Sequence, residues 1–151
     1  MKIRQRAFDS IRAHGAKGFP HEICGLLIGD PAEMLITEAR PVRNVETQNP
    51  DVRYLIDDKE DMRIRKSLYK TDLDVLGYYH SHPNHPAAPS EFDRSRASPW
   101  YAYFIVGVTD GTAKEITAWR LEETTKQFLP EEILVRGTKA RSRESRKKSL
   151  C

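Results

Sequence analysis

One stretch of the chain, from Val75 to Asp93, restricts the possible folds more than any other. Its first five residues, Val75 to Tyr79, are apolar or aromatic apart from one glycine, which is typical of a buried strand, and they lead directly into His80. Three prolines between positions 83 and 89 then prevent a regular helix until Ser90. The segment therefore predicts a strand that ends in polar residues, followed by an irregular loop and a new helix.

His80 and His82 are two apart on this predicted strand, so both imidazoles point to one face and Ser81 to the other. Ser90 and Asp93 have the spacing of a helix start, in which a hydroxyl residue is followed three positions later by an acid. Asp93 would lie in the first helical turn and could add a carboxylate to the two imidazoles. Two nitrogen ligands and one oxygen ligand, with a fourth position open to water, are typical of a catalytic zinc site.

A hydrolytic zinc site also needs a base that takes a proton from water and later gives it to the departing amine. Glu22 is the candidate, at or just before a strand predicted for Ile23 to Ile28. Simpler interpretations remain open. The histidines can be exposed loop residues, and Glu22 can be a solvated acid. A helix start can explain both Ser90 and Asp93 without a chemical role. His85 is interpreted as an exposed loop histidine rather than a ligand.

The rest of the chain also alternates between helical and strand patterns. Apolar residues at helical spacing from Ile3 to Ile11 predict a helix that glycines at 15 and 18 close. An Asp-Gly pair at 110–111 predicts a hairpin turn. Further segments are interpreted as strands over Met34 to Val45, Arg53 to Ile56, Tyr101 to Val108 and Ile116 to Leu121, a surface helix over Asp58 to Thr71, and a last strand or short helix over Phe128 to Val135.

The order His80, Ser81, His82, Pro83, six residues, Ser90, two residues, Asp93 resembles the signature of the JAMM (MPN-plus; Mov34/MPN/PAD-1) zinc metalloproteases at every fixed position. The segment His21 to Leu27 is similar to the glutamate segment of that family. The resemblance implies a single MPN-like domain of the α/β (α+β) class, with a mixed β-sheet flanked by helices in a cytidine-deaminase-like architecture. The chain is too short for the large insertions of eukaryotic relatives, so the compact prokaryotic type is expected.

The same resemblance implies one Zn²⁺ per chain, held by His80, His82 and Asp93, with Glu22 as the general acid/base and Ser90 as a hydroxyl that helps to hold the oxyanion. The implied reaction is hydrolysis of the bond after the C-terminal Gly-Gly of a ubiquitin-like or sulfur-carrier protein. The sequence leaves open whether this is a peptide or an isopeptide bond. The alternative is a non-catalytic MPN-type scaffold that binds protein partners, although such relatives typically lack part of the ligand set.

The composition supports one globular enzyme domain. The 151 residues fit a single domain, and 38% hydrophobic with 31% charged residues is an ordinary globular balance. The two cysteines do not form the pattern of a disulfide scaffold, and Cys24 is interpreted as a small buried hydrophobe. The longest apolar run, Ile23 to Gly29, is far shorter than the roughly 20 residues that span a membrane. Because Met1 to Arg12 lacks a secretory apolar stretch, we expect a cytoplasmic protein without a membrane partner.

The positive charge is concentrated at the C-terminus. Residues 136–151 contain seven Lys or Arg and one Glu, so this segment has a net charge of +6. Because the whole chain has a net charge of +3, the remaining residues have a net charge of −3. We expect residues 1–135 to form the metalloprotease domain and residues 136–151 a basic, disordered tail. A solvated terminus is favoured over a nucleic-acid contact. The oligomeric state, monomer or homodimer, stays open.

Overall fold

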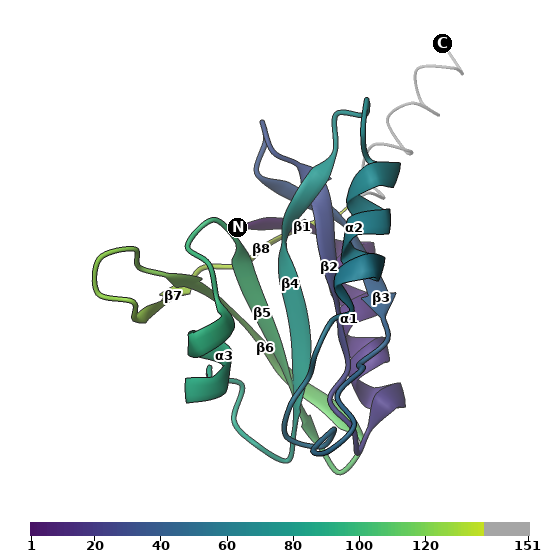
Figure 1. Cartoon of the computed structure of the whole chain (residues 1–151), viewed down its shortest axis with the longest axis vertical. Helices are drawn as coiled ribbons and strands as arrows, with labels where there is room; N and C mark the ends of the chain where they lie inside the picture. The colour runs from purple at the N-terminus through teal and green to yellow at the C-terminus, as the bar shows by residue number, and fades with distance from the viewer. Residues whose placement is uncertain (138–151) are drawn as a thin grey trace.

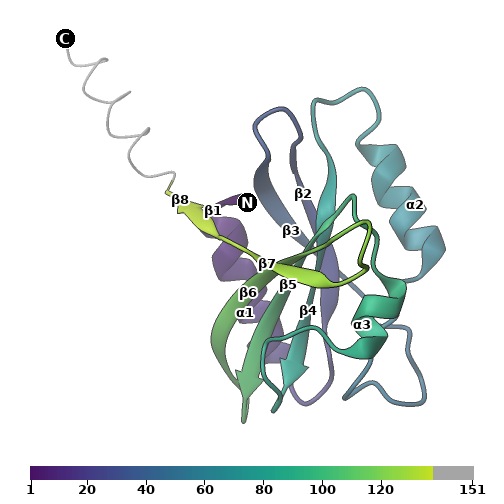
Figure 2. The same ribbon diagram turned by 90° about the vertical axis from the view of Figure 1, so that its left-hand side faces the viewer.

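One mixed β-sheet of eight strands forms the centre of the molecule, in the order β7-β6-β5-β4-β2-β3-β1-β8. The computed structural model describes residues 1–137. The strands are β1 (Lys2–Arg4), β2 (Cys24–Asp30), β3 (Leu35–Val42), β4 (Asp74–Pro83), β5 (Ala102–Thr109), β6 (Thr112–Leu121), β7 (Phe128–Glu131) and β8 (Leu134–Arg136). Helix α1 (Gln5–Gly18) covers one face of the sheet, while α2 (Asp58–Ser67) and α3 (Glu91–Arg96) lie on the other (Figures 1 and 2). This arrangement confirms the predicted α+β class and the mixed sheet between helices.

The central strands β2, β4 and β5 are covered on both faces. β4 pairs with β5 in parallel and with β2 in antiparallel orientation. β2 and β5 are buried along nearly their whole length. Such strands are continuous apolar runs in the sequence because neither face meets water. The predicted hairpin between β5 and β6 is confirmed, with Gly111 in its turn at a φ of 84° that favours glycine.

Each face of the sheet has its own hydrophobic core. The larger core lies under α1 and includes Ile3, Ile11, Tyr79, Phe104 and Val106. The smaller core lies on the side of α2 and consists of Cys24, Leu26, Ile28, Val42, Ile64 and Val75. Cys24 is buried there, as expected of a small hydrophobe. Toward the end of β4, His80 and His82 are buried where apolar side chains would otherwise continue.

The first helix differs from its prediction at both ends. Residues Lys2–Arg4 form strand β1, which pairs in parallel with β3 and β8, and the helix begins at Gln5. It also continues through Gly15 to Gly18. A Cβ on Gly15 would lie 2.9 Å from a methyl group of Val106, so the glycine permits close packing of α1 on the sheet. Tertiary packing, not helix termination, explains this glycine.

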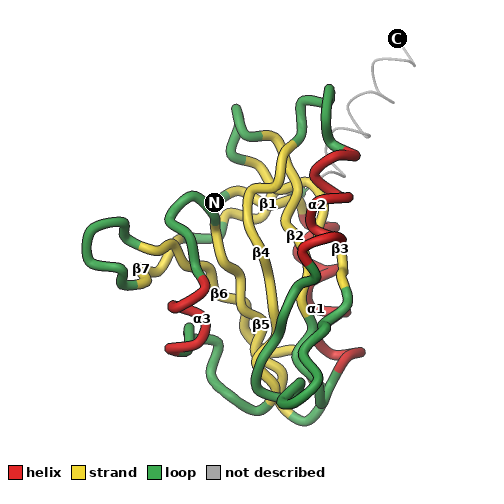
Figure 3. Tube along the Cα trace, viewed as in Figure 1, coloured by secondary structure: helices red, strands yellow, loops and turns green. Residues whose placement is uncertain are grey.

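The strand expected at Arg53 to Ile56 is wrong, because residues 43–57 form a long loop between β3 and α2. Within the described chain, this loop makes one isolated bridge, between Asn44 and Ile56. The Asn44 side chain forms hydrogen bonds with backbone groups that a strand partner would otherwise use. Its Oδ1 accepts from the N–H of Leu55 at 2.9 Å, and its Nδ2 donates to the carbonyl of Arg53 at 3.0 Å. The loop lies at the same end of the sheet as the β5–β6 turn (Figure 3).

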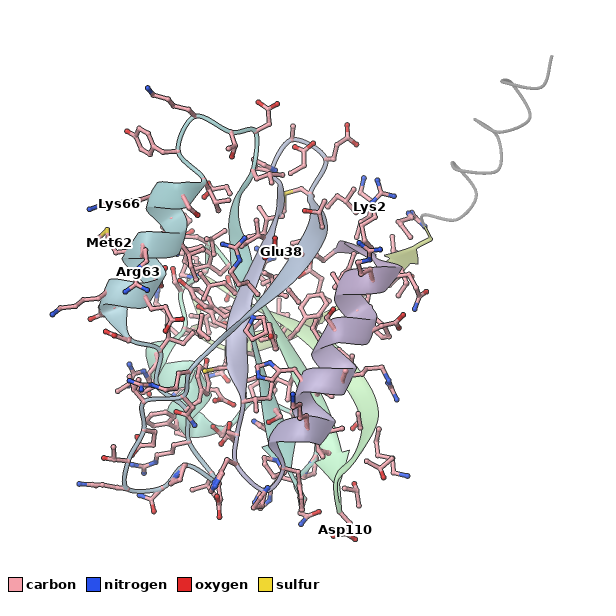
Figure 4. The ribbon with its side chains drawn as sticks, turned by 90° about the vertical axis from the view of Figure 1, so that its right-hand side faces the viewer. Lys2, Glu38, Met62, Arg63, Lys66 and Asp110 are labelled. Atoms are coloured by element: carbon pink, nitrogen blue, oxygen red, sulfur yellow. The ribbon has the colours of Figure 1, made fainter. Side chains whose placement is uncertain are left out.

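Helix α2 is confirmed, although it ends at Ser67 instead of Thr71. Ile64 faces the sheet, whereas Met62, Arg63 and Lys66 point outward (Figure 4). Asp57 caps this helix by accepting from the backbone N–H of Lys59.

The final segment forms two short strands at opposite edges of the sheet, since β7 pairs with β6 and β8 pairs with β1. β8 ends at Arg136, so most of the predicted basic tail lies outside the described residues. None of the helices in residues 1–137 has both the length and the apolar character needed to cross a bilayer.

Candidate metal centre

The C-terminal part of β4 holds two histidines against each other on the side of α2. His80 is 1% and His82 8% exposed, and their Nε2 atoms lie 3.1 Å apart. Between them, Ser81 bonds to Ile23, the residue just before β2: its Oγ accepts from the N–H of Ile23 at 2.9 Å, and its N–H donates to the Ile23 carbonyl at 3.0 Å. The strand thus places the two imidazoles side by side. The hydrogen bonds of Ser81 hold Ile23, and with it the neighbouring Glu22, beside this part of β4.

Asp93 reaches the histidines from the first turn of α3. The predicted capping box is present, with the Ser90 Oγ accepting from the Asp93 N–H at 3.0 Å and the Asp93 Oδ2 accepting from the Ser90 N–H at 2.9 Å. The same Oδ2 lies 3.2 Å from the Nε2 of His80 and 3.2 Å from that of His82. The helix cap therefore also aims the carboxylate at the two imidazoles.

These three atoms form a nearly equilateral triangle, and its dimensions suit a metal ion. Ligand atoms about 2.0–2.1 Å from a tetrahedral zinc ion lie about 3.3–3.4 Å from one another. The sides of the triangle, 3.1–3.2 Å, are close to that spacing. The Nδ1 of His82 lies 2.8 Å from the carbonyl oxygen of Pro86, which can only accept, so a neutral His82 presents a lone pair on Nε2. The residues fit a divalent cation.

The electrostatics differ between the two imidazoles. Burial lowers the pKa of His80, which favours the neutral imidazole that binds metals. Burial alone would raise the pKa of Asp93, but hydrogen bonds from His80 and His82 hold it well below its usual range. Burial alone would lower the pKa of His82, but contacts with Asp93 and the Pro86 carbonyl raise it. The site thus combines an ionised carboxylate with one imidazole that resists protonation and one that binds a proton more readily, so a cation has to compete with a proton at His82.

Glu22 lies beside the triangle and is 4% exposed. Its carboxylate and the ring nitrogens of His80 and His82 provide ligand atoms within 4.8 Å of one another. Its backbone is fixed on both sides, because its N–H donates to the Pro50 carbonyl at 2.7 Å and its carbonyl accepts from the Asn44 Nδ2 at 3.0 Å. Burial raises the pKa of Glu22 to about 8. The carboxyl group is therefore poised to exchange a proton near neutral pH.

A cavity of about 440 Å³ adjoins the site and is lined by Glu22, Val52, His82, His85, Pro86, Ala88 and Ser90. The Ser90 hydroxyl accepts the helix N–H, and its own proton remains available for a further partner. His85 is exposed, as expected, and lies on the cavity wall. The structure therefore brings together all five residues singled out from the sequence: Glu22, His80, His82, Ser90 and Asp93.

Family comparison agrees with the fold. Residues 4–122 match the Prok-JAB family, prokaryotic homologs of the JAB domain. The chain belongs to this family. A desampylase from Haloferax volcanii is 40% identical to this Prok-JAB chain over 130 residues, which cover 82% of the chain and 92% of the relative.

A CysO-cysteine peptidase from Mycobacterium tuberculosis is 27% identical over 123 residues, covering 79% of the chain and 81% of the relative. The crystal structure of a JAB1/MPN domain protein from Archaeoglobus fulgidus superposes with a TM-score of 0.60 at 19% identity, covering 89% of this chain and 98% of that one, and shows the same fold. The Prok-JAB chain is thus a hydrolase with a JAB1/MPN fold.

Sequence reasoning missed the contribution of the β3–α2 loop to this Prok-JAB site. Tyr54 stacks on the His80 ring with 4.5 Å between centroids and 21° between planes, and Val52 lines the cavity. Tyr54 lies in the segment interpreted as a strand, Arg53 to Ile56, and Val52 lies just before it. The spacing of the two residues carries no functional signal. Tyr54 and His80 are more than 20 residues apart in the sequence and come into contact only in the folded structure. The local sequence pattern therefore could not have shown this contact.

Proposed function

We propose that this chain is a zinc-dependent peptidase or isopeptidase that hydrolyses the bond after the C-terminal Gly-Gly of a ubiquitin-like or sulfur-carrier protein. The observation that carries the proposal is the convergence of His80, His82 and Asp93 on one point, with Glu22 buried beside them. The similarity to a desampylase and a CysO-cysteine peptidase supports the substrate class.

Both Asp93 and Glu22 could supply an oxygen ligand, and the distances favour Asp93. Its Oδ2 lies 3.2 Å from each imidazole nitrogen, which is ligand spacing, and backbone hydrogen bonding fixes it there. Glu22 belongs to a looser group with the two histidines, whose ligand atoms all lie within 4.8 Å of one another. A carboxylate at this larger separation suits contact with a water molecule on the ion rather than with the ion itself.

Two imidazoles and one carboxylate, with room for a fourth ligand, are the donor set of many catalytic zinc sites. When bound, the ion would polarise the scissile carbonyl and lower the pKa of a coordinated water to about 7. The protein residues do the rest. Glu22 takes the proton from the attacking water and delivers it to the departing amine, for which a pKa near neutrality is suited. A neighbouring cation would lower this pKa, so that the base form is present.

Ser90 is proposed to donate its hydroxyl proton to the carbonyl oxygen as negative charge develops there. Its oxygen already accepts from the Asp93 N–H, so capping fixes the direction of the hydroxyl without using its proton. Because His80 and Asp93 are deeply buried, the scissile bond must come close to the sheet. A glycine-rich substrate tail, which lacks side chains, meets that demand.

The test is cleavage of a panel of small β-grasp proteins that end in Gly-Gly, extended either by a peptide bond or by an isopeptide bond to lysine. We expect the purified chain to contain about one zinc per protein and to cleave at least one panel member. Chelation should abolish cleavage, and Zn²⁺ should restore it where Mg²⁺ does not, because nitrogen ligands suit zinc. A chain that binds no zinc and leaves every substrate intact would contradict the proposal.

A further inference from the structure

The two imidazoles of the site are held in different ways. The Nδ1 of His82 has a hydrogen-bond partner in the carbonyl of Pro86, at 2.8 Å. The Nδ1 of His80 is fully buried and has no hydrogen-bond partner within residues 1–137. Histidine ligands almost always donate their second ring nitrogen to an acceptor, which fixes the orientation of the ring. His80 must therefore be oriented by something else.

The Tyr54 ring supplies the contact that His80 lacks. The two rings are stacked, with 4.5 Å between centroids and 21° between planes. Aromatic stacking of this kind restricts rotation of the imidazole about its bond to Cβ, because tilting would break the contact. Within residues 1–137 the Tyr54 hydroxyl makes no hydrogen bond, whereas the face of its ring stacks on His80.

The backbone around Tyr54 is fixed on both sides by one side chain. Asn44 donates to the carbonyl of Arg53 and accepts from the N–H of Leu55, the two residues that flank Tyr54. The same Asn44 Nδ2 donates to the carbonyl of Glu22. A loop outside the sheet is thereby tied to the segment that carries the candidate base.

A neighbouring contact ties the loop to α3. The Arg53 guanidinium lies over the Phe92 ring, 4.9 Å from its centroid, and Phe92 precedes Asp93. Adjacent loop residues thus rest on two parts of the site: Tyr54 on His80, and Arg53 on the helix turn that carries Asp93.

We propose that Tyr54 is a positioning residue whose ring stacks on His80 and aims its Nε2 at the metal, in place of the hydrogen bond that other histidine ligands make. The inference rests on the proposed function, because it assumes that His80 binds the ion. It predicts that an aromatic ring at position 54 is needed and that the hydroxyl is not.

The experiment is Co²⁺ titration of the full-length, metal-stripped protein, followed by the visible absorption of the bound ion. The variants are Tyr54→Phe, which keeps the ring, and Tyr54→Leu, which keeps apolar volume. Tyr69→Leu is the matched control, since Tyr69 is 80% exposed. Thermal unfolding of each stripped protein establishes that the variants are folded at the titration temperature.

We expect Tyr54→Phe and Tyr69→Leu to bind Co²⁺ as tightly as the parent protein, with the same spectrum. Tyr54→Leu should bind about 10-fold more weakly or worse, with an altered spectrum, as when an outer partner of a metal ligand is lost. Parent-like affinity in Tyr54→Leu would overturn the inference, and so would an equal loss in Tyr54→Phe, which would assign the effect to the hydroxyl. Failure of the parent protein to bind Co²⁺ would instead contradict the proposed function.

Discussion

Tyr79 and His80 are neighbours in β4 and are equally buried, yet they face two regions of opposite character. Tyr79 lies under α1 in a continuous apolar core, where its hydroxyl lies 2.8 Å from the Nδ1 of His14. His80 faces a cluster of ionisable groups that a short helix and a long loop hold in place. The first region stabilises the fold through burial of apolar surface.

The second region contains both unfavourable and favourable contacts. Burial raises the pKa of Glu22 because the ionised form loses its hydration, whereas contacts with His80 and His82 hold the pKa of Asp93 below its usual range despite its burial. The α1 face of β4 thus mainly stabilises the fold, whereas the opposite face holds ionisable groups, and burial of Glu22 among them costs free energy. Substitutions on the two faces should therefore have different effects.

The largest expected effect is that of Glu22→Gln on the site face. Loss of a general acid/base typically lowers turnover by about 10²–10⁴-fold. Zinc content should stay unchanged, and stability should not fall, because the amide has the same shape without the cost of burying a charge. Turnover, zinc content and thermal unfolding are measured together, with Glu33→Gln at an exposed position as the control. Full activity in Glu22→Gln would place the base elsewhere.

The next effect is that of Phe104→Ala on the α1 face. Phe104 is fully buried and pairs with Tyr79 across β4 and β5. Its truncation should lower the free energy of unfolding by about 3–5 kcal/mol, as measured by urea denaturation. Metal affinity of the folded protein should be retained, because the side chain lies on the other side of the sheet from His80. A large loss of metal affinity in folded Phe104→Ala would show that the faces are coupled.

The smallest effect concerns Ser90, which takes part in both structure and proposed chemistry. Ser90→Ala removes a helix cap and should lower the free energy of unfolding by about 1 kcal/mol. Ser90→Asn can still cap the helix, so it should recover most of that stability. If Ser90 also contacts the substrate oxygen, turnover should stay low in Ser90→Asn. If Ser90→Asn recovers both stability and turnover, Ser90 acts only as a helix cap.

Much of the fold could be predicted because its strongest signals are local. The apolar runs of β2 and β5, the Asp-Gly turn before β6 and the Ser90 cap of α3 are each set by a few adjacent residues. The failures have a common cause. Gly15 lies in a helix because α1 packs closely on Val106, and Arg53 to Ile56 is a loop because Asn44 takes its backbone partners. In both cases the local structure is set by residues that are distant in the sequence.

The sequence by itself determined which residues could form the site, since the spacing of His80, His82 and Asp93 within one strand, loop and helix cap is local geometry. Tertiary structure alone decided what surrounds them. Glu22 lies at the site because β2 pairs with β4, which places Cys24 opposite His80. Tyr54 contacts His80 from a loop whose position cannot be predicted from strand pairing. Local spacing determines where a side chain points, whereas contacts between distant segments depend on how the whole sheet assembles.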